Sequence, residues 1–331
     1  MSLTPLFFLD LLADQKLMPA AVKLHFGQGD LHTLLPLVED ERFCIFSADF
    51  PCLIDADLAG QLPTEFMQAL QSAGCQLLAS EMIHHSAEQT KPVPPPGGRW
   101  LAGNWYLAAP AKPSVRQAAS RALALKLLQR VAADADTYEI EAFFRQDPVL
   151  AYHLLRLVNS LGVGAGRHIS SFSQAILILG RQQLKRWLNL MLFAASRDDH
   201  RSAMLLARVA VRARSMELMA KTCGFDRSGQ ERAFLAGMFS LLGILFGMPL
   251  AEILSPLRLN ESLSSAVLHH EGELGRLLHA VESAEETDDA MLTRLLGELS
   301  LSNADFNLIS LEAYRWMLDV VHDGAADVYT H

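Results

Sequence analysis

Residues 147–180, DPVLAYHLLRLVNSLGVGAGRHISSFSQAILILG, decide the fold predicted for most of this chain. Asp147 can cap a helix whose first position is Pro148, where the missing N–H costs nothing and the ring presets φ. Apolar residues then recur at helical spacing, and this helix is expected to end at Asn159, Ser160 and the glycines that follow. The stretch therefore predicts a buried helix with a sharp glycine-rich corner.

A second helix is expected directly after this corner. Ser171 with Gln174 three residues later forms a capping box for a second apolar segment, which closes at Gly180. The order of helix, Asn-Ser break, glycine loop, Ile-Ser and a short helix ending in Leu-Gly resembles the opening of the HDOD family, the HD-related output domain of bacterial signalling proteins. The resemblance extends from about Ser114 to about Tyr314, and it implies an all-helical, HD-like domain.

Length and composition describe a folded chain with room for two domains. The chain has 331 residues, of which 50% are hydrophobic and 20% charged. The net charge of -9 argues against a general binder of nucleic acid. Four cysteines without paired metal-ligand spacing fit a reducing compartment. The N-terminal run MSLTPLFFLDLL fails as a signal peptide, and the uncharged segment 233–251 is expected to be a core helix rather than a membrane span. We therefore expect a soluble, cytoplasmic protein that does not bind membranes.

The texture of the sequence changes near residue 112. Short β-leaning runs mixed with possible helices predict a small α/β domain over residues 1–112, and a helical pattern predicts an all-α domain over residues 113–331, so the overall class is α+β. The β-leaning runs are 22–26, 43–46, 75–79 and 105–108, with a helix over 65–72 between them. The helices expected in the second domain are 114–133, 136–146, 181–196, 202–222, 230–247, 261–270, 290–299 and a last one around 306–320.

Residues 101–110, LAGNWYLAAP, resemble the last strand of EAL domains, which hydrolyse the bacterial messenger cyclic di-GMP and often precede HDOD domains in one chain. An EAL barrel needs roughly twice the length available here, so the resemblance implies a truncated, degenerate EAL-like domain. Neither the Glu-Ala-Leu motif nor the Asp-Asp-Phe-Gly motif of EAL chemistry occurs between Met1 and Pro110.

The HD-type metal site implied by the family has no matching ligands in this chain. An HD-type phosphohydrolase holds a divalent metal with one histidine, an adjacent His-Asp pair and a later Asp, and the metal activates a water molecule. Laying residues 208–243 on that pattern places Arg208 at the first histidine and Phe239-Ser240 at the His-Asp pair. A guanidinium has five donors and no acceptor, so it cannot bind a metal. We therefore predict no catalytic residues, no cofactor and no enzyme activity.

His269, His270 and Glu271 are the weak candidates for metal ligands. On a helix, adjacent side chains diverge by about 100° and cannot chelate one ion from the same face. A polar helix end is the favoured interpretation, and no metal is expected.

Charge is unevenly distributed along the second domain. Residues 181–214 carry eight Lys/Arg against two Asp, and residues 252–331 carry fifteen Asp/Glu against four Arg. The favoured explanation is that the two faces complement each other within the fold or in a homodimer. The alternative is a basic patch, centred on Arg208 and Arg212 one turn apart, that binds an acidic partner or a nucleotide. Asn159 and Ser160 are further candidate binding residues, although satisfying the backbone at the helix break is favoured for both.

These observations lead to one function and two alternatives. The leading hypothesis is a non-catalytic signalling protein, a pseudoenzyme linked to cyclic di-GMP, whose HDOD domain binds a signalling protein partner. The first alternative is a sensor that binds a cyclic dinucleotide in the N-terminal domain or in the cleft between domains. The second is a residual metal-dependent HD-type phosphohydrolase.

Overall fold

The computed structural model describes residues 4–86, 100–108, 186, 199–257 and 259–325. The helical hairpin predicted over 147–180 lies outside these ranges, and with it Asn159 and Ser160. The domain junction near residue 112 and the predicted helices 114–133 and 136–146 also lie outside them, as does 181–196 except for residue 186.

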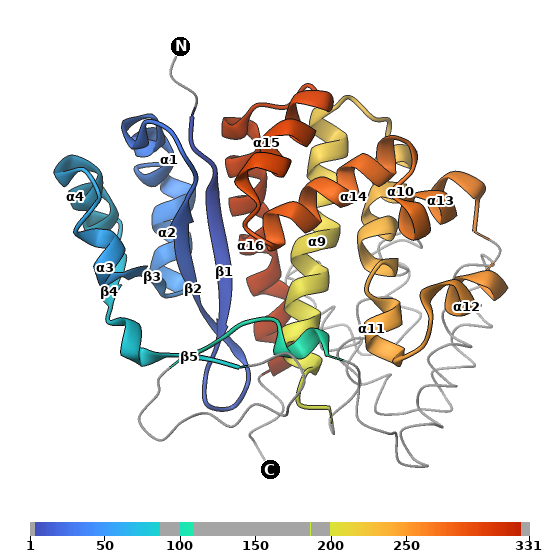
Figure 1. Ribbon diagram of the computed structural model, residues 1–331, viewed down its shortest axis with the longest axis horizontal. Helices are drawn as coiled ribbons and strands as arrows, with labels where there is room; N and C mark the ends of the chain where they lie inside the picture. The colour runs from blue at the N-terminus through green and yellow to red at the C-terminus, as the bar shows by residue number, and fades with distance from the viewer. Residues whose placement is uncertain (1–3, 87–99, 109–185, 187–198, 258, 326–331) are drawn as a thin grey trace, which may run out of the picture.

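The N-terminal part of the described chain forms one mixed six-stranded sheet in the order β4-β3-β2-β1-β6-β5 (Figure 1). The strands are β1 (Phe7–Ala13), β2 (Pro19–Phe26), β3 (Cys52–Asp55), β4 (Gln76–Leu78), β5 (Ile83–His85) and β6 (Trp100–Ala102). β1 is antiparallel to both of its neighbours, whereas β2, β3 and β4 run parallel, as do β5 and β6. β4 and β5 each pair on one side only, so the sheet is an open half-barrel.

Short helices are interleaved with these strands. They are η1 (Leu31–Leu34), α1 (Leu35–Val38), α2 (Glu41–Asp49), α3 (Ala56–Ala59), α4 (Thr64–Ser72), η2 (Ser80–Met82) and η3 (Trp105–Leu107). Phe7 of β1 meets Phe43 of α2 edge to face at a centroid distance of 5.7 Å. Phe26 of β2 meets Phe66 of α4 in the same way at 5.2 Å. Phe7 and Phe26 are cross-strand partners, so these ring contacts fix α2 and α4 to the same sheet face.

The helical region continues the chain to the right of the sheet in Figure 1. Its elements are α9 (Ser202–Thr222), α10 (Arg227–Phe239), α11 (Leu242–Phe246), α12 (Leu250–Leu254), η4 (Ser255–Leu257), α13 (Glu261–His269), α14 (Gly272–Glu285), α15 (Asp289–Glu298) and α16 (Asn303–Ala325). α9 packs against α10, α14 and α16 and is buried along most of its length. α9 is therefore the central helix of this region, although its buried residues include Arg208 and Arg212. Gly237 of α10 allows the closest approach, because a Cβ there would lie 2.7 Å from the Cα of Ala213.

α16 completes the sheet where strand pairing stops. β6 pairs with β1 only at Ala13, so the backbone groups farther along that edge of β1 need other partners. The side chain of Asn307 accepts a hydrogen bond from the N–H of Phe7 at 2.9 Å and donates one to the carbonyl of Pro5 at 2.9 Å. The hydroxyl of Tyr314 donates to the carbonyl of Leu9. Sheet and helical region therefore share one hydrophobic core.

The structure confirms some predicted elements and corrects others. The helix over 202–222 is found with the predicted bounds, and the predicted 65–72, 22–26 and 75–79 correspond to α4, β2 and β4. The prediction of strands at 43–46 and 105–108 is wrong, because these residues lie in α2 and η3.

One predicted helix is interrupted in the structure, and several observed elements were not predicted. The helix predicted over 230–247 is interrupted at Ser240 and Leu241 into α10 and α11. β1, β3, α12 and α14 were not predicted at all. The apolar residues Phe7–Ala13 form β1, which is buried on both faces.

By length and hydropathy, no single helix in the described part of the chain could cross a membrane. One pair bent by 115°, Arg227–Phe246 with Leu250–Leu257, passes that test only jointly.

We predict that Asn307→Ala destabilises the fold by about 2–4 kcal/mol, because it leaves the buried Phe7 N–H and Pro5 carbonyl without partners. Urea unfolding measures the change. Leu308→Ala, on the exposed neighbouring side chain, is the matched control and should stay within about 0.5 kcal/mol of wild type. Equal midpoints for the two variants would contradict the role assigned to Asn307.

Candidate functional site

Arg212 lies at the centre of a buried ion-pair network. It is 5% exposed, and a buried guanidinium needs paired charges and hydrogen bonds. Its Nε donates to Glu285 at 2.9 Å, its Nη1 donates to Glu282 at 2.9 Å, and the same Nη1 lies 2.8 Å from the hydroxyl of Ser240. Both glutamates belong to α14, so Arg212 joins the central helix α9 to α14.

Arg208, one turn earlier on α9, extends this network to the sheet. It is 6% exposed and donates to the hydroxyl of Tyr106 from Nε at 2.9 Å and from Nη2 at 2.5 Å. Its Nη1 lies 3.8 Å from Glu285, and its guanidinium carbon lies 5.7 Å from the centroid of the Tyr106 ring. Tyr106 belongs to η3, which follows β6 after two residues. The network therefore connects η3, α9 and α14.

The protonation states of these groups follow from burial and charge. Burial raises the pKa of Tyr106 and of Tyr314, so both remain neutral hydroxyls at physiological pH. Burial would also raise the pKa of Glu285, but the positive charges of Arg212 and Arg208 outweigh it and hold that pKa below its ordinary value. Glu285 is thus an ionised carboxylate shared between two guanidinium groups.

His270 forms the solvent-exposed end of the network. It follows α13 in a left-handed conformation with φ of 56°. Its Nε2 lies 2.6 Å from Glu282, and its ring centroid lies 5.5 Å from that of His279. The structure places the three metal candidates on different elements: His269 ends α13, His270 follows it and Glu271 caps α14. Within the ranges that the structure describes, no group of three or more His, Cys, Asp or Glu is arranged to hold a metal ion.

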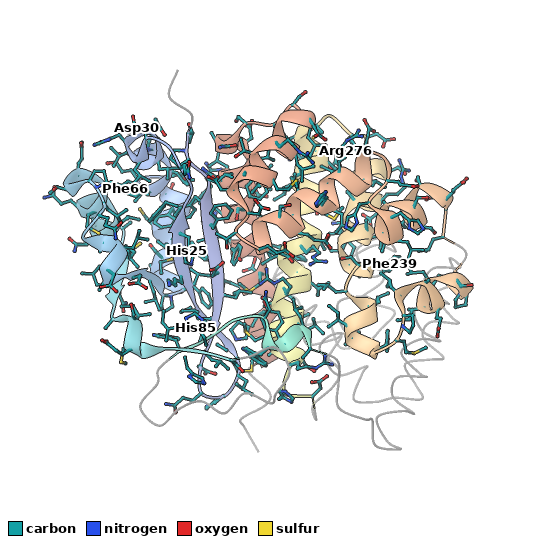
Figure 2. The ribbon with its side chains drawn as sticks, viewed as in Figure 1. His25, Asp30, Phe66, His85, Phe239 and Arg276 are labelled. Atoms are coloured by element: carbon teal, nitrogen blue, oxygen red, sulfur yellow. The ribbon has the colours of Figure 1, made fainter. Side chains whose placement is uncertain are left out.

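The three positions aligned with HD-type ligands do not fit a metal either. Arg208 carries only donors, and Phe239 at the end of α10 is an apolar side chain that is 2% exposed (Figure 2). The hydroxyl of Ser240 donates to the carbonyl of Gly237 and contacts Arg212. A guanidinium cluster, rather than a set of metal ligands, fills this region.

The ion pairs confirm the favoured explanation of the charge distribution for the basic residues that the structure describes. Arg212 and Arg208 pair with acids of α14, and Arg214 lies 2.8 Å from Glu312 of α16. Arg186 pairs with Glu217 and Glu231, and Arg201 with Asp199. Arg208 and Arg212 are themselves buried and paired with acids of α14. A binding role for them, as for Asn159 and Ser160, stays a prediction that the structure does not test.

Sequence reasoning found part of this site. Arg208 and Arg212 were identified from their spacing, whereas Tyr106, Glu282, Glu285 and Tyr314 were missed. Tyr106 lies within LAGNWYLAAP, and the acidic segment 252–331 was noted, but α14 was not recognised as a helix. The spacing of Glu282 and Glu285 on one helical face was therefore a signal that was available and not used.

A family model described as the HDOD domain matches residues 113–274. The chain contains an HDOD domain. The HDOD match includes α9, α10 and the network residues Arg208 and Arg212, and it ends within α14.

The HDOD domain has relatives of known name. The chain is 32% identical over 200 residues to "Cyclic di-GMP phosphodiesterase CdgJ" of Vibrio cholerae, covering 60% of this chain and 46% of that one. It is 28% identical over 179 residues to "Uncharacterized protein YuxH" of Bacillus subtilis, covering 54% and 43%. The chain thus matches less than half the length of either relative. A solved HDOD domain protein with unknown function from Geobacter sulfurreducens aligns with a TM-score of 0.39 and 19% identity, covering 66% of this chain and 93% of that one.

These relatives correct one prediction from the sequence. The chain was expected not to be an enzyme, but CdgJ is named a cyclic di-GMP phosphodiesterase and therefore points to an enzyme. The expectation rested on Arg208, Phe239 and Ser240, which concern only an HD-type metal site.

We predict that Glu285→Gln lowers the free energy of unfolding at pH 7 by about 3 kcal/mol, because two buried guanidinium groups lose their shared carboxylate. The low folded-state pKa of Glu285 stabilises the wild type above the unfolded value of about 4.5, and this stabilisation is lost as pH falls through the folded value. As the pH falls from about 5 to about 3, the free energy of unfolding should therefore decrease less steeply in the variant than in the wild type.

Urea midpoints measured across that pH range test both statements. Glu286→Gln, on the exposed adjacent residue, is the control and should follow the wild-type curve. If the free energy of unfolding of Glu285→Gln depended on pH as steeply as that of the wild type, the assigned protonation state would be contradicted.

Proposed function

We propose that this chain acts in cyclic di-GMP signalling and that cyclic di-GMP is its ligand. The observation that carries the proposal is the 32% identity to CdgJ over 60% of this chain, together with the HDOD domain. The partial coverage of CdgJ means that the activity in its name is a proposal for this chain. Any hydrolysis here uses groups other than Arg208, Phe239 and Ser240, because those three cannot hold an HD-type metal.

We also propose that the N-terminal half-barrel is a truncated EAL-like domain. In a closed α/β barrel the first and last strands pair, and here β1 pairs with β6 while β4 and β5 remain as edges. This pattern is what remains when strands are removed from the middle of a barrel. The likeness of LAGNWYLAAP to the last EAL strand supports the same interpretation, because β6 and η3 lie within or beside that segment.

The shared core suggests how such a signal reaches the HDOD domain. Arg208 bonds to Tyr106 of the sheet region and neighbours Glu285 of α14, and Tyr314 of α16 bonds to β1. A ligand that shifts the sheet relative to α9 or α16 must break or rearrange these buried contacts. Conformational change in one part is thus coupled to the other through a contiguous set of contacts.

We predict that the purified full chain binds cyclic di-GMP with a saturable heat in isothermal titration calorimetry. A ligand concentration of 100 times Kd should stabilise the fold by about 2.7 kcal/mol in thermal unfolding, because only the folded chain binds it. Cyclic di-AMP, with the same phosphates and different bases, is the matched control and should produce a weaker effect.

A second experiment distinguishes a phosphodiesterase from a sensor. The protein is incubated with cyclic di-GMP and Mg²⁺ or Mn²⁺, and the nucleotide is then analysed by chromatography. Loss of the cyclic nucleotide would assign a phosphodiesterase, and binding without turnover would assign a sensor. Neither heat nor turnover with cyclic di-GMP would overturn the proposal.

A further inference from the structure

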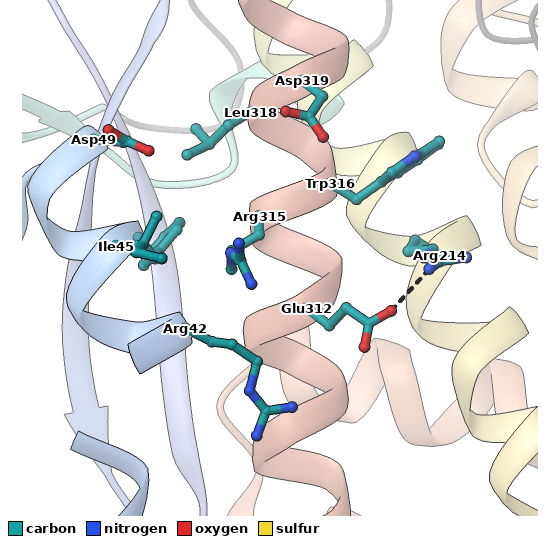
Figure 3. Close-up of a pocket in the computed structure, with 10 residues that line it drawn as sticks. Arg42, Ile45, Asp49, Arg214, Glu312, Arg315, Trp316, Leu318 and Asp319 are labelled. Atoms are coloured by element: carbon teal, nitrogen blue, oxygen red, sulfur yellow. Dashed lines mark hydrogen bonds and ion pairs between the residues drawn. The ribbon is translucent and has the colours of Figure 1, made fainter. Parts of the chain in front are cut away.

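A groove of about 570 Å³ lies where α2 of the sheet layer meets α16 and α9 (Figure 3). This volume falls within the range of about 300–1,000 Å³ typical of small-molecule sites. We propose that the groove binds a guanine nucleotide of the cyclic dinucleotide class, an inference that rests on the proposed function. Because its walls come from both the sheet layer and the helical region, the groove exists only while the two are packed together.

The charged side chains of the groove balance one another. The arginines are Arg42, Arg214 and Arg315, and the carboxylates are Asp49, Glu312 and Asp319. A lining of zero formal charge does not favour a simple polyanion, and it suits a ligand that offers both acceptors and donors. Guanine offers both, because its O6 and N7 accept from an arginine fork while its N1–H and amino group can donate to a carboxylate. The phosphates of a cyclic dinucleotide accept further guanidinium N–H groups.

Several guanidinium donors in the groove are available to such a ligand. Arg315 makes no hydrogen bond or ion pair with the part of the chain that the structure describes, although its charge helps to lower the pKa of Asp40. Arg42 is held in place by Asp40 through Nε and Nη2, which leaves its Nη1 unused within the same ranges.

Apolar surface between these charges suits the faces of purine bases. Figure 3 shows Ile45 of α2 facing Arg315 and Leu318 of α16, with Trp316 on the opposite side of α16 near Arg214. Ile45 is 42% exposed, so it offers apolar surface on the α2 side of the groove. An aromatic or apolar surface flanked by arginines is the arrangement on which nucleotide bases stack.

Binding of fluorescently labelled cyclic di-GMP to the full chain, followed by anisotropy, tests the site. Arg315→Ala and Arg42→Ala should each raise Kd by about tenfold or more, because each removes a guanidinium from the groove. Arg294→Ala, which removes an exposed guanidinium of α15, is the matched control and should leave Kd unchanged. Within the described ranges Arg315 makes no hydrogen bond or ion pair, so an unchanged thermal midpoint of Arg315→Ala would show that any weaker binding is not caused by unfolding.

The outcomes of this experiment distinguish a failure of the groove proposal from a failure of the proposed function. If the wild type binds cyclic di-GMP and neither groove variant weakens it, the groove is excluded while the proposed function stands. If the wild type does not bind cyclic di-GMP, the proposed function falls, and GMP as the probe then decides the groove. Binding of GMP that Arg315→Ala weakens would retain the groove as a guanine site, and no binding of GMP would exclude it.

Discussion

The carboxylate of Glu285, shared between Arg212 and Arg208, determines how the sheet region and the helical region pack. Two guanidinium groups on one buried helix are costly to desolvate, so they must find partners in the same place. The observed packing brings both Glu285 of α14 and the Tyr106 hydroxyl of η3 to the guanidinium groups of α9. We infer that the network contributes more to the choice of a single packing arrangement than to the net free energy of folding.

The same network explains why the three described positions aligned with HD-type ligands do not form a metal centre. The position that would offer the first histidine carries Arg208, which is committed to Tyr106, and the hydroxyl of Ser240 lies beside Arg212. The carboxylates of Glu282 and Glu285 are already paired with these arginines, so a cation would have to displace a guanidinium group to use them as ligands. The proposed nucleotide groove lies elsewhere on α16, where the charges are balanced and more exposed. Structural and ligand-binding roles of arginine are thus assigned to different surfaces of the same few helices.

Local sequence patterns predicted those elements whose conformation depends on neighbouring residues. They failed where contacts with residues far away in the sequence determine the conformation. The helix 202–222 could be predicted because its apolar and helix-favouring residues continue without interruption up to Gly224. Residues 43–46 have β-leaning side chains, yet Asp40 caps a helix there and Phe43 packs against the sheet. For the site, the spacing of Arg208 and Arg212 was readable, but their burial was not, since the glutamates that pair with them lie about 70 residues later in the chain. Such pairing depends on tertiary structure and leaves no local pattern in the sequence.

The bonds that α16 makes to β1 have a consequence for the order of folding. The Phe7 N–H and the Asn307 side chain that satisfies it are 300 residues apart, so during synthesis the ribosome releases the strand long before it makes its partner. Until then one edge of the strand exposes unpaired backbone beside apolar side chains, which is the kind of surface that associates with other chains. Contacts of such long range also slow the search for the native topology. The N-terminal strand therefore completes its backbone hydrogen bonding only after α16 has been translated.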